Sequence, residues 1–328
     1  MWNYNFTVAQ APDFNDEDLS FVTQLGLKYI YTVLPPLKEE HSAAAVKRRV
    51  SLAASHGVVI SNLNSGLYIK PPDVFLGEDT RDETIKGMID FFYVLAEAGF
   101  TRFTMTWEPD QVWSTHHEAL VRGCKTRYVN LDELTRHPFT HGREYELKEI
   151  WDAFSYFMDR IMPVCEKTGI KIVLHPNDPP TYLKLGGCPC LIKCLDDYKK
   201  AFEIAGSDML GMEFCCGCWL EGRSEGMGDI LGDLDWCLEN NKVEVVHFRN
   251  IDKPLPEFTE VFPDMGYFDM YKIMRLLCKH DYQGMITLDH TPQMVDGSKK
   301  RIPTAYAIAY MRALAERAIA ELVTERKL

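Results

Sequence analysis

The stretch Ile170-Lys-Ile-Val-Leu-His175 decides the fold of this chain. It is a short apolar run rich in β-branched residues, which is typical of a strand buried on both faces. Helical patterns flank it, from Leu147 to Thr168 on one side and from Leu191 to Ile204 on the other. A strand between two helices is the repeating unit of a parallel α/β sheet.

The same alternation recurs through all 328 residues. Further strands are predicted at Asn5–Ala9, Lys28–Leu34, Val58–Asn62, Phe103–Trp107, Met209–Cys215, Val243–Phe248 and Met285–Asp289. Further helices are predicted at Asp16–Leu25, Glu39–His56 (stopped by Gly57), Asp82–Ala98, Asp229–Asn240, Tyr267–His280 and from Pro303 toward Thr324. Eight strand–helix units predict an α/β protein with a closed (β/α)8 TIM barrel, as a single domain over residues 1–328.

Two features refine this prediction. The alternative, an open doubly wound sheet, is disfavoured because no glycine-rich phosphate loop follows any strand; the first turn reads Gln10-Ala-Pro-Asp-Phe-Asn15. Residues 108–145 show no period and are too long for a bare connection, which indicates an insertion or lid after strand four.

Composition excludes several classes of protein. The net charge of −12 argues against nucleic-acid binding, which depends on neutralising phosphates. No apolar stretch is long enough for a membrane span, and the N-terminus lacks a signal-peptide pattern, so we expect a cytoplasmic protein with no membrane partner. Its 10 cysteines are then expected to be thiols. The Ala305–Ala313 stretch suits helix packing, and its apolar face could also serve a homo-oligomer.

Four potential metal ligands fall at the ends of four consecutive strands: His175, Cys215, His247 and Asp289. Strand ends meet at one pole of a barrel, where active sites are built. Each residue alone has an ordinary structural interpretation, but their coincidence at successive strand ends favours a site. Two imidazoles, a thiolate and a carboxylate suit a first-row divalent ion such as Mn, Fe, Co or Zn.

Other residues near these strand ends carry open alternatives. Cys216 and Cys218 compete with Cys215 as the thiolate, although strand alternation separates Cys216 from it. Asp178 could hold a ligand imidazole, or be a turn residue before Pro179. His290 could be an acid/base at the pocket mouth, or a packing residue.

Several motifs together resemble the mannonate dehydratase family of xylose-isomerase-like barrels. They are His175-Pro-Asn-Asp-Pro-Pro180, Cys215-Cys-Gly217, Val246-His-Phe-Arg-Asn250, Phe268-Asp-Met-Tyr271 and Leu288-Asp-His-Thr-Pro-Gln-Met294, followed by Tyr306-Ala-Ile308. The similarity runs in order from about residue 170 to 320, with a weaker match at Trp107-Glu-Pro109. The family's N-terminal Arg-Trp pair is replaced here by Phe6-Thr-Val-Ala-Gln10, and Ser114-Thr-His-His117 departs from its Arg-rich segment.

The resemblance implies a lyase (hydro-lyase) that converts a sugar acid, D-mannonate, to 2-keto-3-deoxy-D-gluconate and water. It implies binding of Mn by His175, Cys215, His247 and Asp289. It also implies that Arg249 contacts the substrate and that Tyr306 takes part in proton transfer, with His290 as a second candidate. The alternative is a metal-dependent sugar isomerase or epimerase on the same barrel.

Strand alternation gives Arg249 a specific expected position. It places Arg249 on the same side as His247, one pleat nearer the mouth of the barrel. From there a guanidinium could hold the carboxylate of a sugar acid through two parallel hydrogen bonds. The alternative is that Arg249 pairs with a neighbouring acid such as Asp252 and braces a loop.

Overall fold

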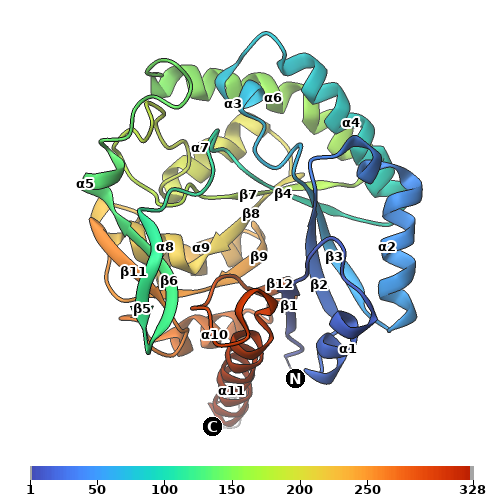
Figure 1. Cartoon of the computed structure of the whole chain (residues 1–328), viewed down its shortest axis with the longest axis vertical. Coiled ribbons are helices and arrows are strands. Elements are labelled where there is room, and N and C mark those ends of the chain that lie inside the picture. The colour runs from blue at the N-terminus through green and yellow to red at the C-terminus, as the bar shows by residue number, and fades with distance from the viewer. Residues whose placement is uncertain (1, 326–328) are drawn as a thin grey trace.

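A computed structural model describes residues 2–325. Its central sheet has eight parallel strands in the order β3-β2-β1-β12-β9-β8-β7-β4, curled into the barrel visible in Figure 1. The strands are β1 (Asn5–Ala9), β2 (Tyr29–Leu34), β3 (Val59–Ser65), β4 (Arg102–Thr106), β7 (Lys171–His175), β8 (Leu210–Cys215), β9 (Val243–Phe248) and β12 (Met285–Leu288). The predicted eight-stranded parallel barrel is therefore confirmed.

The seam between β3 and β4 is bridged by side chains. The Nδ2 of Asn62 donates to Thr104 Oγ1 at 2.7 Å, and the backbone N–H of Thr104 donates to Asn64 Oδ1 at 2.9 Å. All three residues are buried. These bonds satisfy polar groups that would otherwise be costly to bury where the strands do not pair.

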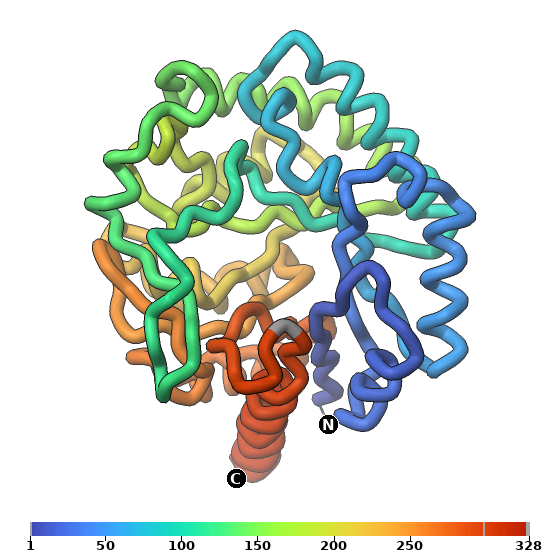
Figure 2. Tube along the Cα trace, in the orientation of Figure 1, coloured from blue at the N-terminus to red at the C-terminus, as the bar shows by residue number. Residues whose placement is uncertain are grey.

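Helices surround the barrel and bury their apolar faces against it (Figure 2). They are α1 (Asp16–Gln24), α2 (Ala43–Ser55), α3 (Pro72–Leu76), α4 (Arg81–Glu97), α6 (Leu147–Thr168), α7 (Leu195–Ala205), α8 (Cys216–Glu221), α9 (Ile230–Glu239), α10 (Met270–Lys279) and α11 (Arg301–Glu325). Many ends follow from local chemistry: Asn15 caps α1 in a capping box, and α6 ends at Gly169, whose φ of +75° suits glycine. None of the helices in the described part of the chain has the length and apolarity that crossing a membrane requires.

Some predicted helices begin later than the sequence pattern suggested. The predicted helix Glu39–His56 is split into a 3₁₀ turn and α2, because the Ser42 hydroxyl accepts the N–H of Ala45 and starts a new helix. Asp269 likewise caps α10, so that the helix predicted from Tyr267 starts at Met270. Cys194 is extended, so α7 begins at Leu195 and not at Leu191.

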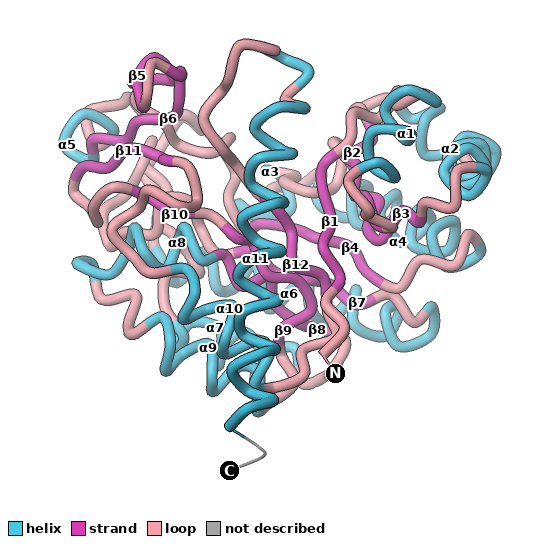
Figure 3. Tube along the Cα trace, turned by 90° about the horizontal axis from the view of Figure 1, so that it is seen from below, coloured by secondary structure: helices cyan, strands magenta, loops and turns pink. Residues whose placement is uncertain are grey.

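A second, smaller sheet lies beside the barrel. Its order is β10-β11-β6-β5, with antiparallel pairs, and Figure 3 shows it at one side of the barrel strands. Its strands are β5 (His116–Val121), β6 (Cys124–Asn130), β10 (Asn250–Ile251) and β11 (Glu257–Val261), and the short helix α5 (Leu131–Leu134) follows β6. Residues 108–145 thus pair with the segment that follows β9, which fixes them against the mouth of the barrel.

Candidate active site

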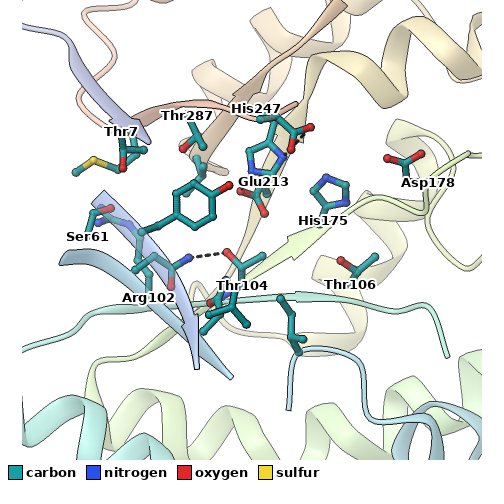
Figure 4. A pocket seen from close by; sticks show the side chains of 18 of the residues that line it. Thr7, Ser61, Arg102, Thr104, Thr106, His175, Asp178, Glu213, His247 and Thr287 are labelled. Atoms are coloured by element: carbon teal, nitrogen blue, oxygen red, sulfur yellow. Dashed lines mark hydrogen bonds and ion pairs between the residues drawn. The ribbon is translucent and has the colours of Figure 1, made fainter. Parts of the chain in front are cut away.

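A cavity of about 190 Å³ lies inside the barrel. Polar side chains line much of it, and Figure 4 shows them converging from opposite strands. They include Thr7, Tyr31, Asn62, Asn64, Thr104, Thr106, Glu213 and Thr287, with His175, His247, Asp289 and His290 toward one pole. The interior of a TIM barrel is normally filled with branched apolar residues. A polar lining instead suits a small polar ligand, since buried polar groups need hydrogen-bond partners.

The structure brings the four predicted metal ligands together. Ligand atoms of Cys215, His247 and Asp289 lie within 4.8 Å of one another. Those of His175, Cys215 and Cys218 do the same, so Cys215 is common to both groups. The four residues lie at the ends of β7, β8 and β9 and just after β12, where the parallel register places Cys215 opposite His247.

The surroundings of Cys215 favour its thiolate. Burial alone would raise its pKa, but the neighbouring Cys218, the charge of Arg249 and the nearby imidazoles of His175 and His247 outweigh burial and hold the pKa of Cys215 well below its usual range. Burial instead raises the pKa of Cys216 and of Cys218 well above the usual value. Among the three cysteines Cys215 is thus the best metal ligand, because the thiolate is the coordinating form.

His290 lies at the mouth of the cavity. Its side chain is 44% exposed, with Nδ1 3.1 Å from Glu260 Oε1 and Nε2 3.3 Å from Asp289 Oδ1. Burial opposes its protonation, but the charges of Asp289 and Glu260 raise the pKa of His290 above its ordinary value. His290 therefore lies at the cavity lining between two carboxylates that favour its protonated form.

Arg249 lies beside the predicted ligands Cys215 and Asp289 but outside the cavity lining. Its side chain is 0% exposed and is absent from the cavity lining. It donates to Glu221, Glu260 and Asp178 at 2.5 to 3.0 Å. Its Nε lies 2.9 Å from Asp289 Oδ2 as an ion pair, without the geometry of a hydrogen bond. A guanidinium with its donors so engaged cannot also hold a substrate carboxylate, so the geometry does not support the predicted contact.

A buried charge cluster forms around Arg249. Arg127, which is 3% exposed, pairs with Asp178 at 2.6 Å and with Glu260 at 3.1 Å, and Glu221 is 3.6 Å away. The sequence suggested that Asp178 could hold a ligand imidazole. In the structure Asp178 instead accepts hydrogen bonds from Arg127 and Arg249. Arg249 Nη2 also lies 3.4 Å from Cys215 Sγ. The cluster therefore contacts the candidate metal ligands directly.

Tyr306 also lies away from the predicted position. It projects from α11 with 38% of its surface exposed, and its hydroxyl donates to Asp264 at 2.6 Å and accepts from Arg122 at 3.2 Å. It does not line the cavity. In this arrangement Tyr306 braces the outer sheet against α11, which does not support a role in proton transfer.

Sequence reasoning missed three polar residues at the cavity. Glu213 lies on β8 within 4.8 Å of ligand atoms of His175 and His247. Its position two residues before Cys215 was a usable signal, because strand alternation places both on one face. Lys70 and Glu108 form a buried ion pair that lines the opposite wall, and no strand pattern could have paired their loops.

The donor set fits a divalent metal ion. Two imidazoles, a thiolate and a carboxylate converge, and His247 Nδ1 is buried without a hydrogen-bond partner on the side of Asp289, 3.6 Å from its Oδ2. A buried ring nitrogen without a partner is costly unless something binds it. The ligand types are those of first-row divalent ions.

A parallel (β/α)8 barrel with these donors at its C-terminal pole defines a class of metal-dependent barrel enzymes. Comparisons with known proteins specify the class further. The family model of D-mannonate dehydratase matches residues 100–324, and the chain belongs to that family, which is metal-dependent.

Individual relatives agree with this assignment. Mannonate dehydratase from Lactococcus lactis subsp. lactis is 30% identical over 190 residues, which cover 56% of this chain and 46% of that protein. Mannonate dehydratase from Streptococcus uberis is 31% identical over 181 residues, covering 54% and 46%. The chain thus matches about half the length of these curated relatives.

Solved structures confirm the fold. The crystal structure of mannonate dehydratase from Streptococcus suis serotype 2 superposes with a TM-score of 0.87 at 19% identity, covering 98% of this chain and 95% of that chain. A 3-keto-D-glucoside 4-epimerase from E. coli superposes with a TM-score of 0.62 at 12% identity, covering 95% and 100%.

Proposed function

We propose that this protein is a metal-dependent hydro-lyase that removes water from D-mannonate to give 2-keto-3-deoxy-D-gluconate. The observation that carries the proposal is the convergence of His175, Cys215, His247 and Asp289 at one end of a polar cavity, in a chain of the D-mannonate dehydratase family. We propose Mn²⁺ as the resident ion and these four residues as its ligands. A bound divalent ion would supply Lewis acidity that stabilises the negative charge formed when the proton next to the carboxylate is removed.

Other residues of the cavity supply an acid/base group and hydrogen bonds to the substrate. His290 lies at the cavity mouth and is the candidate acid/base in place of Tyr306. The reaction removes a proton from C2 and a hydroxide from C3, and the resulting enol becomes the 2-keto product. The Lys70–Glu108 pair and the threonines of the wall offer hydrogen bonds to sugar hydroxyls.

A groove at the mouth suits an anionic substrate. It shares Val112, Asp289 and His290 with the cavity, and its volume is about 900 Å³. Its lining includes four cationic side chains that are not fully buried, Lys125, Lys299, Lys300 and Arg301, beside the acidic Asp18, Glu260 and Asp289. In a chain of net charge −12, such a local concentration of cations attracts a carboxylate to one opening.

The cysteines support the expected location. The ten cysteines, all within the described residues, are thiols and not disulfide halves, which suits a reducing compartment such as the cytoplasm. We propose that the protein acts there.

The test is an assay of the purified, Mn²⁺-loaded protein on D-mannonate, other hexonates and neutral ketoses, with detection of the 2-keto-3-deoxy product. We expect product from a hexonate, and none after His247→Ala. Glu321→Gln is the matched control, since Glu321 pairs with Arg317 on α11 and neither residue lines the cavity or the groove. Turnover of ketoses without loss of water would contradict the proposal and favour an epimerase.

A further inference from the structure

Glu213 is an unexplained acidic residue inside the barrel. Its exposure is 3%, and its neighbours on β8 include the buried Met212 and Phe214. Figure 4 shows its carboxylate beside His247, with His175 next to them. A carboxylate so deeply buried is costly unless it has a definite partner. Its partner therefore indicates its function.

That partner is one nitrogen of His247. Glu213 Oε1 lies 2.6 Å from His247 Nε2, whereas Oε2 is buried with no hydrogen-bond partner. An ionised carboxylate can only accept, so this contact requires the proton of the imidazole on Nε2. The lone pair of a neutral His247 is then on Nδ1, the atom left without a partner near Asp289.

His175 has the opposite arrangement. Its Nδ1 lies 2.6 Å from the carbonyl oxygen of Pro176, which can only accept, so Nδ1 carries the proton and Nε2 is free. The two imidazoles lie with ring centroids 5.2 Å apart. The backbone therefore fixes one tautomer and a buried side chain fixes the other.

We propose that Glu213 is a positioning residue that holds His247 as the Nε2–H tautomer and so presents Nδ1 to the metal. This inference rests on the proposed metal site and adds a residue to it. A carboxylate that accepts from the far nitrogen of a ligand histidine fixes the ring and raises its basicity. The competing arrangement makes Glu213 itself a ligand, with the ion between Glu213 and His247 Nε2; these atoms and those of His175 also lie within 4.8 Å.

The decisive measurement is the tautomer of His247 in the wild-type protein. The probe is Zn²⁺, which is diamagnetic, bound to protein labelled with ¹⁵N-histidine, and long-range ¹⁵N–¹H spectra identify the protonated nitrogen of each ring. We expect Nε2–H with Nδ1 bound to zinc for His247, and the reverse for His175. Zinc on Nε2 of His247 would overturn the inference and make Glu213 a ligand.

Variants give an independent measurement. We expect Glu213→Ala to weaken Zn²⁺ affinity about 10- to 100-fold in chelator competition, the usual effect of losing a partner of a metal ligand. Glu213→Gln keeps an oxygen that accepts from Nε2–H, so its loss should be smaller and its His247 tautomer unchanged. Glu321→Gln, the control, should bind Zn²⁺ as the wild type does. Unchanged affinity in both Glu213 variants would refute the positioning role.

Failure of this inference is separable from failure of the proposed function. Zinc affinity and tautomer are measured without substrate. A protein with the expected tautomer that does not dehydrate any hexonate retains this inference and loses the proposed activity. An active dehydratase with zinc on His247 Nε2 would retain the proposed activity and overturn this inference. Because the tautomer is read from wild-type protein, poor folding of Glu213→Ala cannot hide the result.

Discussion

Removal of the guanidinium of Arg249 should destabilise the fold by a predictable amount. Arg249→Met keeps the length of the side chain but leaves Asp289 without its arginine partner, and leaves Asp178, Glu221 and Glu260 to Arg127 alone. Breaking a fully buried ion pair from one side costs about 3–5 kcal/mol. Arg249→Lys keeps the charge, but a compact ammonium cannot match donors that point to four carboxylates, so its loss should be intermediate.

The expected change in melting temperature follows from the size of the chain. Unfolding entropy is about 2.1 cal/mol/K per residue, which gives about 0.7 kcal/mol/K for 328 residues. A loss of about 3–5 kcal/mol therefore lowers Tm by about 4–7 °C. The assay is thermal unfolding of metal-free protein by circular dichroism, at low and at high salt, because a buried cluster is screened far less than a surface pair.

The control for this prediction is an exposed arginine. Arg143 pairs with Glu149 at 2.9 Å, with about half of each side chain exposed. Such an exposed pair adds little stability, so Arg143→Met should change Tm by no more than about 1–2 °C. If Arg249→Met changed Tm as little as Arg143→Met, the buried cluster would not stabilise the fold as we describe.

Three further outcomes are expected. Gly217→Ala should cost about 1–3 kcal/mol in thermal unfolding, because a Cβ there would overlap the guanidinium of Arg249; an unchanged Tm would contradict this packing. Burial raises the pKa of Glu260, but His290, Arg249 and Arg127 together hold it well below its usual range, so its stabilisation is present above about pH 4.3 and is lost as pH falls toward the folded pKa. Glu260→Gln should therefore flatten the fall of Tm on acidification. Finally, His175→Ala should weaken Mn²⁺ binding in equilibrium dialysis, and parental affinity would mean that the ligand is misassigned.

The barrel was predictable because its signal is repeated. Each central strand is a short apolar run, and a helical pattern follows, so an error in one unit does not change the class. The small sheet was not predictable in this way. In β5 (His116–Val121) most residues are exposed, and β10 has only two residues, so neither shows the alternation by which a half-buried strand is recognised. Strand β6, the partner of β5, also pairs with β11, which is distant in sequence.

The candidate site, like the fold, could be predicted from the sequence only in part. The four strand-end residues were predicted because a parallel barrel brings the same end of every strand to one pole. The partners of Arg249 could not be predicted, because Arg249 follows the last residue of β9, Phe248, and the period-two rule holds only within the strand. Beyond a strand end, local turns and charge partners orient a side chain. Acidic groups distant in sequence, such as Asp178 and Glu221, turned Arg249 away from the cavity.

The charge balance around the site favours the cation proposed there. Two guanidiniums, those of Arg127 and Arg249, form ion pairs with four buried carboxylates. The pKa of the Cys215 thiol is lowered, so its thiolate adds to the excess of negative charge. Burial, followed by repulsion from Asp178, raises the pKa of Glu221 well above its usual value, which relieves part of this excess by keeping a proton. A divalent ion held next to Cys215 and Asp289 would offset the rest without adding a buried side chain. Arg127 and Arg249, of which the family resemblance implied a substrate contact for Arg249 alone, therefore lie in this chain as fixed countercharges beside closely packed anionic groups.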